Sequence, residues 1–536
     1  MALSVLPALA GVLAGPGGAG KGAGRDGPPP PPPPGPAPEE EDGMMESLDP
    51  IPPAERTWNW VSFALLWVAM TINPMGMVLG SSLVDLGLGV GAFAGALSVA
   101  IAVLLAGFLA NSVAGAKYGV PFPVYARAAF GVRGALWVAL LRGVVGVVWL
   151  GLQAWFGAGL IYNSLLTAFP GLAAAPALDL GRTNVAEMGI FLAFVAVHAG
   201  AVLVGLKRVE RLLKVASPVQ VVGLAAMAGW ALAQQPPAES LGRVADMRSP
   251  GGGDVHFPFG MAVTALVSAW STLILNVADL SRYAQDQRSQ LVGQAVGFPA
   301  AFFVTVFSGL LVCGAAYARS GEVAWNLAPI LRTTPAWFAL PVGASMAVGV
   351  LSVNVLANII SPANDVINIC PERISFKAAA LGSLALAVVS CPWRTLADPH
   401  SFVDTFLVGY GMLTGALFGI MSVDFFALRK RELDVAGLYA RGPRGPYHYV
   451  RGFRLKALLA QAVALALLLP GFLAELGLAR VPAALEALYE LSWFTSTIVG
   501  AAVYALVAWG DGGKPRVRYV ELGSGGGADV SGVELM

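Results

Sequence analysis

Charged residues, histidine and cysteine are all scarce in this sequence. Asp, Glu, Lys and Arg make up 12% of the 536 residues, whereas a soluble globular domain carries about 25%. So little charge cannot cover a large water-facing surface, which excludes a soluble protein. The 33 basic residues are balanced by 32 acidic ones, for a net charge of +1. This balance excludes the electrostatic binding of nucleic acid.

The scarcity of cysteine and histidine also limits the chemistry. The three cysteines lack the paired spacing of zinc ligands. A membrane-embedded transferase or hydrolase would need clustered His, Asp or Glu, or a nucleophile with a base in reach. We therefore expect no metal, no cofactor and no enzymatic activity. The four histidines lie on separate segments, at His198, His256, His400 and His448.

Long apolar segments are what the sequence has instead. Hydrophobic residues make up 56% of the chain, and its mean hydropathy is +0.69. Windows of about 20 apolar residues, the length that crosses a bilayer as a helix, repeat from Trp60 to Trp509. They predict an all-α polytopic membrane protein with about twelve spans. The predicted spans begin near Trp60, Leu88, Leu136, Ala186, Leu212, Phe259, Leu291, Trp337, Ala378, Phe402, Ala457 and Ala484.

The two ends of the chain differ from this apolar region. Residues 1–56 contain a proline-rich and then acidic run, Gly27–Asp42, which indicates a disordered tail. Residues 57–510 form the predicted membrane domain, and residues 511–536 form a second flexible tail. An even number of spans would put both tails on the same side.

Basic residues identify that side. They gather in the loops on the side of the amino-terminal tail, most densely from Arg429 to Lys456, whereas the opposite loops hold few, such as Arg182 and Arg394. By the positive-inside rule both termini are predicted to be cytoplasmic. The plasma membrane is the favoured location, and a plastid envelope is the alternative.

The first span is interrupted in its middle by Asn73, Pro74 and Gly76. Pro74 removes a backbone donor, so carbonyl groups are freed at mid-membrane depth, where they can coordinate ions or polar substrates. The alternative is a proline kink that neighbouring helices repair. An inverted repeat would place a matching break in the sixth span, but no Gly or Pro lies near Trp270.

Polar side chains at helical spacing are the second signal. Trp149 and Gln153 are four residues apart, and so are Asn354 and Asn358, so each pair shares one helix face. Amides are costly in hydrocarbon unless they are paired or line a cavity. They offer the donor and acceptor that match the edge of a planar N-heterocycle, and tryptophan offers a flat face for the ring. The alternative is that these amides only hold helices together.

Five segments in order resemble motifs of the nucleobase–cation symport family, class one. They cover most of residues 57–455 and are GVPFPVYARAAFGVRGA (Gly119–Ala135), WLGLQAWFGA (Trp149–Ala158), WSTLILNVADLSRYA (Trp270–Ala284), NVLANIISPANDVINI (Asn354–Ile369) and DFFALRKRELDVAGLY (Asp424–Tyr439). The resemblance implies a twelve-span symporter of the leucine-transporter type. Spans one to five and six to ten would form an inverted repeat, followed by two carboxy-terminal helices.

The resemblance also implies the substrate class. Members of the family carry purines, pyrimidines such as uracil, allantoin or hydantoins across the lipid bilayer, driven by protons or sodium. In a hydantoin carrier of the family two tryptophans hold the ring, and they match Trp149 and Trp270. Its hydrogen-bonding amides match Gln153 and Asn358, and further pocket amides fall on Asn73 and Asn354. Which ring is carried, and the oligomeric state, stay open.

A sodium site in the same carrier falls on five positions, Ala69, Ile72, Gly349, Ser352 and Val353. Valine has no side-chain oxygen, and a small cation needs oxygens that replace its hydration shell. We therefore favour proton coupling, with a sodium-coupled carrier as the alternative.

Asp279 and Asp365 are the candidate proton-coupling residues, because ionisable groups at such depth are functional candidates. The alternatives are an ion pair of Asp279 with Arg282 and a helix cap at Asp365, after Pro362. A channel is disfavoured, because no repeated filter motif is visible.

Overall fold

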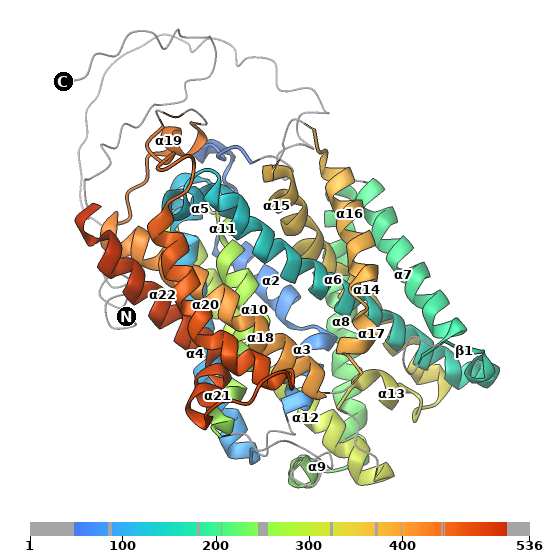
Figure 1. The fold of residues 1–536 in the computed structure, drawn as a ribbon. Helices are drawn as coiled ribbons and strands as arrows, with labels where there is room; N and C mark the ends of the chain where they lie inside the picture. Colours follow the sequence, from blue (N-terminus) through green and yellow to red (C-terminus); the bar gives the residue numbers. More distant parts are fainter. Residues whose placement is uncertain are drawn as a thin grey trace, which may run out of the picture.

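Helices account for nearly every element that the computed structural model describes, and its single small sheet joins β1 (Ala177–Leu178) to β2 (Thr183–Asn184). Figure 1 shows the long helices packed side by side in one bundle. The described residues are 48–83, 88–178, 183–204, 206–244, 256–321, 325–369, 373–397, 399–440, 443 and 445–511.

Twelve segments of these described residues match the twelve predicted spans. Eight are long apolar helices, two are helix pairs bent at a short break, and two are shorter apolar helices. The all-α polytopic fold is thereby confirmed. The eight are α4 (Val90–Tyr118), α6 (Gly134–Ala168), α7 (Val185–Val204), α10 (Pro258–Asn276), α12 (Gln287–Ser320), α14 (Ala336–Val353) continued by η4 (Asn354–Ile360) and α15 (Ser361–Ile369), η5 (Ser401–Val408) continued by α18 (Gly409–Ser422) and η6 (Val423–Leu428), and α20 (Leu455–Glu475).

The remaining elements are the bent pairs, the shorter apolar helices and short connecting helices. The bent pairs are α2 (Trp60–Thr71) with α3 (Pro74–Ser82) and α21 (Ala483–Glu490) with α22 (Ser492–Ala508), and the shorter apolar helices are α16 (Phe376–Val389) and residues Pro218–Gln234 of α8 (Leu206–Gln234). The connecting helices are η1 (Pro53–Glu55), α5 (Phe122–Phe130), η3 (Pro170–Ala174), α9 (Pro237–Val244), α11 (Ala278–Ser281), α13 (Leu327–Leu331), α17 (Pro392–Thr395), α19 (Val435–Tyr439) and η7 (Trp509–Asp511).

The first span breaks where the sequence predicts. α2 ends at Thr71, α3 begins at Pro74, and the two axes differ by 56°. Pro74 suits the first position of a helix, where its missing N–H is not needed. Asn73 caps α3 by accepting a hydrogen bond from the Gly76 N–H at 3.0 Å. The sixth span, in contrast, runs as one helix through Trp270 to Asn276, as the absence of Gly and Pro there indicates.

Three π-helical turns occur in spans eight and ten of the described residues. η4 lies in the middle of span eight, while η5 and η6 lie at the two ends of span ten. A π-turn is wider than an α-turn and occurs often at functional sites. η4 contains both Asn354 and Asn358, so the amide pair singled out in the sequence sits on this widened turn.

Glycines let the broken first span approach α12 closely. A Cβ added at Gly309 of α12 would lie 2.0 Å from the Met77 carbonyl oxygen of α3, and one at Gly80 would lie 2.1 Å from that of Val306. Both clashes are with backbone, so a larger side chain would push the helices apart. Small residues at such crossings are typical of membrane helix pairs.

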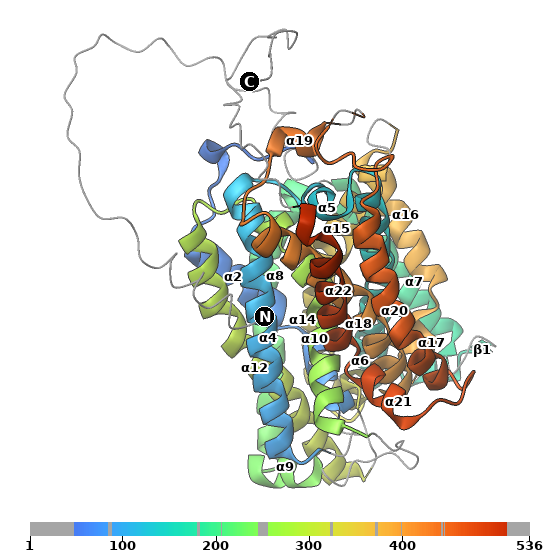
Figure 2. The same ribbon diagram turned by 60° about the vertical axis from the view of Figure 1, so that its left-hand side comes forward.

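The fifth motif builds a buried charge cluster. The Asp424 carboxylate accepts hydrogen bonds from Arg429 Nε and Arg454 Nη1, each at 2.6 Å, and from the Tyr504 hydroxyl at 2.7 Å. Asp424 is 1% exposed. The cluster ties span ten to α22 and to the start of α20, and α19 and α5 lie at the same end of the bundle in both views (Figure 1, Figure 2).

The predicted tails are only partly described. Residues 1–47 and 512–536 lie outside the described residues. Residues 48–56, which the sequence analysis assigned to the tail, contact the bundle instead. The Ile51 N–H donates to the Gly119 carbonyl at 3.0 Å, and Arg56 Nη1 donates to the Ala116 carbonyl at 3.0 Å. The structured region therefore begins before residue 57.

Candidate functional site

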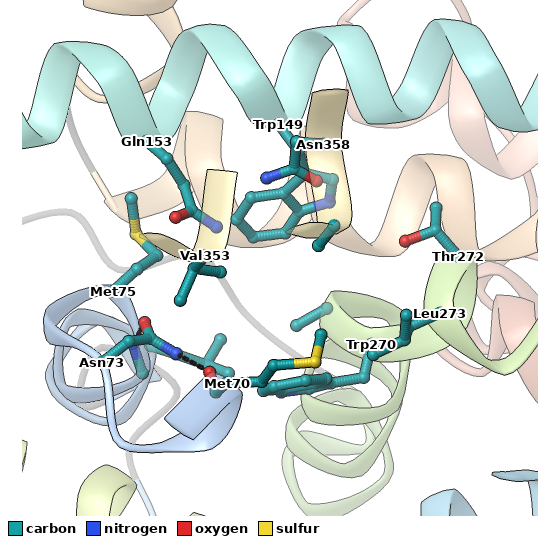
Figure 3. A pocket seen from close by; sticks show the side chains of 14 residues that line it. Met70, Asn73, Met75, Trp149, Gln153, Trp270, Thr272, Leu273, Val353 and Asn358 are labelled. Atoms are coloured by element: carbon teal, nitrogen blue, oxygen red, sulfur yellow. Dashed lines mark hydrogen bonds between the residues drawn. The ribbon is translucent and has the colours of Figure 1, made fainter. Parts of the chain in front are cut away.

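A pocket lies where the break of span one meets spans three, six and eight. Its free volume is about 60 Å³, and Figure 3 shows the side chains that surround it. Five of the six predicted substrate residues line it, and Asn354 does not. The lining residues are Met70, Asn73, Met75, Gly76, Leu79, Trp149, Gln153, Ala269, Trp270, Thr272, Leu273, Val353, Ala357 and Asn358.

The two tryptophans lie on opposite sides of the gap, Trp149 on α6 and Trp270 on α10 (Figure 3). Trp149 Nε1 donates a hydrogen bond to the Tyr410 hydroxyl at 3.1 Å, and that hydroxyl donates in turn to the Ser268 carbonyl. The Trp149 ring is therefore fixed by a span-ten tyrosine that the sequence analysis did not single out.

Trp270 is fixed by aromatic packing. The rings of Phe298 and Phe302 on α12 meet it edge-on, with centroids 5.8 and 5.5 Å away, an arrangement that aromatic pairs favour. The pocket thus has two oriented aromatic walls.

Gln153 brings an unpaired amide to the pocket. Its side chain is 7% exposed, it lines the gap, and its Oε1 has no hydrogen-bond partner in the described part of the chain. A buried amide oxygen without a partner costs about 1–3 kcal/mol. A ligand that donates a hydrogen bond there would remove this cost, which makes Gln153 a recognition group.

Asn358 and Asn354 act as a pair. Asn358 lines the pocket, and its Nδ2 donates to Asn354 Oδ1 at 2.9 Å. Asn354 is fully buried behind it, where its Nδ2 is 3.3 Å from the Leu150 carbonyl and 3.1 Å from His198 Nε2. Asn354 therefore reaches the pocket only through Asn358.

Asn73 lines the pocket, but most of its amide is engaged. Its Nδ2 donates to the Met70 carbonyl at 2.7 Å and to the Thr71 carbonyl at 3.3 Å, while its Oδ1 accepts from the Gly76 N–H. One lone pair of Oδ1 is left for a ligand. The same side chain thus holds the helix break and offers a single acceptor.

The predicted cation positions lie beside the pocket, with Val353 in its wall. Gln220 of α8, which the sequence analysis did not single out, reaches this region. Its Nε2 donates to the Ala69 carbonyl at 2.7 Å. A Cβ added at Gly349 would lie 2.1 Å from Gln220 Oε1. The glutamine side chain therefore fills space next to two of the predicted ligands.

The remaining two predicted cation positions, Ser352 and Ile72, already form hydrogen bonds with neighbouring residues of their own helices. The Ser352 hydroxyl donates to the Val348 carbonyl at 2.9 Å, within its own helix. Ile72 is the residue at which α2 ends, and its N–H bonds to the Val68 carbonyl at 3.0 Å.

Asp279 and Asp365 lie in different surroundings. Asp279 Oδ1 accepts from the Phe122 N–H at 2.7 Å, and its Oδ2 accepts from the Ser361 hydroxyl at 2.9 Å. Asp365 lies inside α15 rather than at its start, and it forms an ion pair with Arg142 of α6 at 3.2 Å.

This ion pair is buried, with side-chain exposures of 2% for Arg142 and 1% for Asp365. Asp365 Oδ1 has no partner in the described part of the chain. Arg142 also donates to the carbonyl of the pocket residue Ala357 at 3.2 Å. The sequence analysis did not identify Arg142, because one basic residue in an apolar span gives no hint of its partner.

One group of potential metal ligands occurs in the described part of the chain, away from the pocket. His400, Asp404 and Glu475 lie where span ten begins and span eleven ends. Nδ1 of His400 contacts Asp404, while its Nε2 is 3.8 Å from Glu475 Oε1. The two ring nitrogens of His400 therefore face different carboxylates.

A bundle of membrane-crossing helices, with a broken first span that meets three other spans at an aromatic and amide-lined pocket, defines a membrane transporter. A family model described as permease for cytosine/purines, uracil, thiamine, allantoin matches residues 50–495. The chain belongs to this permease family, which confirms the resemblance to the nucleobase–cation symport family.

Two curated relatives match most of the chain. A purine-uracil permease of Arabidopsis thaliana is 30% identical over 468 residues, which cover 86% of this chain and 77% of that protein. An allantoin permease of Bacillus subtilis is 30% identical over 473 residues, which cover 86% of this chain and 92% of that protein.

Solved structures share the fold. A nucleobase-cation-symport-1 family transporter in a closed conformation with bromovinylhydantoin bound has a TM-score of 0.66 at 23% identity, and the match covers 87% of this chain and 96% of that one. A sodium-coupled sialic acid symporter has a TM-score of 0.54 at 13% identity and covers 84% of this chain and 90% of that one. These likenesses confirm the leucine-transporter type of fold.

Proposed function

We propose that this transporter carries a nucleobase or a related planar N-heterocycle, such as uracil, a purine or allantoin, by proton symport. One observation carries the proposal: two fixed tryptophans face each other across a gap that also holds the unpaired Gln153 amide. The tryptophans would stack on the ring, while Gln153 and Asn358 would read its N–H and C=O edge.

The size of the pocket supports a free base. A cavity needs about 10–15 Å³ of such volume for one water molecule, so 60 Å³ holds about four to six waters. This space suits a single base better than a nucleoside with its sugar. The relatives that carry purine-uracil and allantoin substrates agree with that class.

Proton coupling is supported by the chemistry of the predicted cation site. Val353 offers no oxygen, and Gln220 already donates to the Ala69 carbonyl that a sodium ion would need. Asp365 is the stronger proton candidate, because it is buried in a span and its Oδ1 has no hydrogen-bond partner in the described part of the chain. Asp279 is the weaker one, because both of its oxygens already accept hydrogen bonds.

In this scheme protonation of Asp365 weakens its attraction to Arg142, which also contacts the pocket wall at Ala357. The proton and the ring would therefore influence each other across α6. Asp365→Asn is expected to keep binding of the base and to lose the dependence of uptake on a proton gradient. Uptake that still follows the gradient in this variant would remove Asp365 from the mechanism.

The location follows the same proposal. We place both termini in the cytoplasm, supported by the excess of Lys and Arg in the loops on that side. The plasma membrane is favoured over a plastid envelope, and the protein acts as a carrier rather than as an enzyme.

Uptake of radiolabelled bases into cells without their own carriers tests the function. Saturable uptake of uracil, a purine or allantoin is expected, rising at acidic pH and indifferent to sodium. Trp149→Ala and Gln153→Ala should abolish it. Trp155→Ala is the matched control, because Trp155 lies on the same helix but packs against Phe191 outside the pocket. A membrane-inserted protein that moves none of these rings would overturn the proposal, whereas sodium-dependent uptake would overturn only the proton coupling.

A further inference from the structure

His198 lies in the second half of α7 and is fully buried, and it does not line the pocket. Its Nδ1 is 2.8 Å from the Phe194 carbonyl oxygen. A carbonyl oxygen only accepts hydrogen bonds, so Nδ1 carries a hydrogen. The Phe194 ring also meets the imidazole edge-on, with centroids 4.7 Å apart. The ring orientation is therefore fixed from two sides.

The other ring nitrogen faces an amide. Nε2 is 3.1 Å from Asn354 Nδ2. A charged imidazole would place two N–H groups among neutral partners in a buried site, which is costly. In the neutral ring Nε2 is an acceptor when Nδ1 carries the hydrogen. It therefore accepts from the NH₂ group of Asn354.

This contact fixes the Asn354 amide. Its two hydrogens face two acceptors, His198 Nε2 and the Leu150 carbonyl at 3.3 Å. If the amide turned over, its oxygen would face these two acceptors and repel both. Asn354 Oδ1 therefore has to point toward Asn358, as it does.

The chain of contacts ends at the pocket. Because Asn354 presents its Oδ1, Asn358 must donate from its NH₂ group. It does so at 2.9 Å. The Asn358 carbonyl oxygen has no hydrogen-bond partner in the described part of the chain, and Asn358 lines the pocket. The amide thus keeps an acceptor for a ligand.

From these contacts we infer that His198 is a positioning residue, which fixes through Asn354 the orientation of the Asn358 amide in the pocket. The pocket is thereby set to accept a hydrogen bond from a ring N–H at this point. This consequence for the substrate rests on the proposed function, whereas the hydrogen-bond chain itself does not.

The wider turn of η4 explains why the hydrogen-bond chain from His198 to Asn358 can form. Asn354 and Asn358 are both on this π-turn, so one residue of the turn can face α7 while the other faces the pocket. Sequence separation hides the link, because α7 and η4 lie about 150 residues apart.

Nitrogen-15 histidine labelling tests the hydrogen-bond chain without any substrate. The protein has four histidines, so His198→Gln identifies the His198 signals in solid-state NMR spectra of the protein in lipid. The expected result is a neutral ring with hydrogen on Nδ1 and a bare Nε2. A ring with hydrogen on Nε2 would overturn the inference.

Selective binding tests the consequence. Uracil has hydrogen on N3, whereas cytosine has a bare N3, so the dissociation constant of cytosine divided by that of uracil reports the amide orientation. His198→Leu removes the acceptor for Asn354 and is expected to lower this ratio about tenfold. His198→Gln, whose Oε1 can accept in place of Nε2, should restore it.

Val202→Ala is the control, because Val202 is a buried residue of α7 that takes no part in the hydrogen-bond chain from His198 to Asn358. It should change protein yield without changing the ratio. A His198→Leu protein that binds both bases with the wild-type ratio would overturn the inference, while leaving the proposed function intact. A wild-type protein that binds neither base would overturn the proposed function, and the NMR result would then decide the hydrogen-bond chain alone.

Discussion

Replacing Gln220 with alanine and Val353 with serine is expected to create a response to sodium. In the wild type Gln220 Nε2 donates to the Ala69 carbonyl at 2.7 Å, and the side chain fills the space beside Gly349. The double variant removes this amide and adds a hydroxyl. The five predicted positions would then offer three carbonyls and two hydroxyls, which are the oxygen ligands that a small cation needs.

The magnitude follows from the contacts that change. Gln220→Ala leaves the partly buried Ala69 carbonyl without this donor, which costs about 1 kcal/mol of unfolding free energy. A sodium ion with a dissociation constant of about 10 mM would return about 1.4 kcal/mol at about 100 mM sodium, by mass action on the folded state. The double variant should thus recover its lost stability in sodium.

Thermal unfolding of the purified proteins in sodium chloride and in choline chloride measures this response. The midpoint of the double variant should rise in sodium, and that of the wild type should not. Val353→Ser alone keeps the glutamine and should not respond either. The reasoning fails if sodium raises the wild-type midpoint, because Gln220 would then not exclude the ion, or if the double variant ignores sodium.

Three further variants test other contacts. Tyr410→Phe removes the acceptor of Trp149 Nε1 and should raise the KM for the base about fivefold to tenfold with normal protein yield, so an unchanged KM in uptake assays would contradict the role of this tyrosine. Asp424→Asn breaks a buried cluster with two arginines and should cost about 3 kcal/mol or more, visible as a lower thermal midpoint. Gly309→Ala would put a Cβ 2.0 Å from backbone and should sharply reduce folded protein, whereas Gly229→Ala, with open space around it, should be tolerated.

Much of the fold could be predicted because membrane helices follow from local composition. Each of the twelve spans, the break at Asn73 in span one and the unbroken helix of span six depends on residues within a single segment. The Trp149 and Gln153 pair was visible for the same reason, since four residues bring two side chains to one helix face.

The missing parts of the site come from other segments. Gln220, Tyr410 and Arg142 each act on a residue of a distant span, through Ala69, Trp149 and Asp365 respectively. Nothing in the local sequence of an apolar span tells which of its few polar groups faces which neighbour.

The sequence also did not reveal which role each asparagine amide has. Asn73 is mainly engaged by its own backbone, and Asn354 lies behind the pocket rather than in it. The same residue type in the same motif can cap a helix, position a neighbour or face a ligand. The choice depends on which carbonyl groups the folded chain brings near, and only the structure gives these distances.

The glycines of α12 have a consequence for motion. Besides Gly309, a Cβ at Gly293 would lie 2.5 Å from the Trp60 carbonyl oxygen, and one at Gly297 would lie 2.5 Å from that of Ala64. α12 is therefore pressed against both halves of the broken span, one on each side of the bend. No side chain separates these backbones, so we expect the three helices to move together. In that case the bend in span one keeps its angle when the carrier turns its pocket from one side of the membrane to the other, and the movement takes place at the side-chain contacts between these helices and their neighbours.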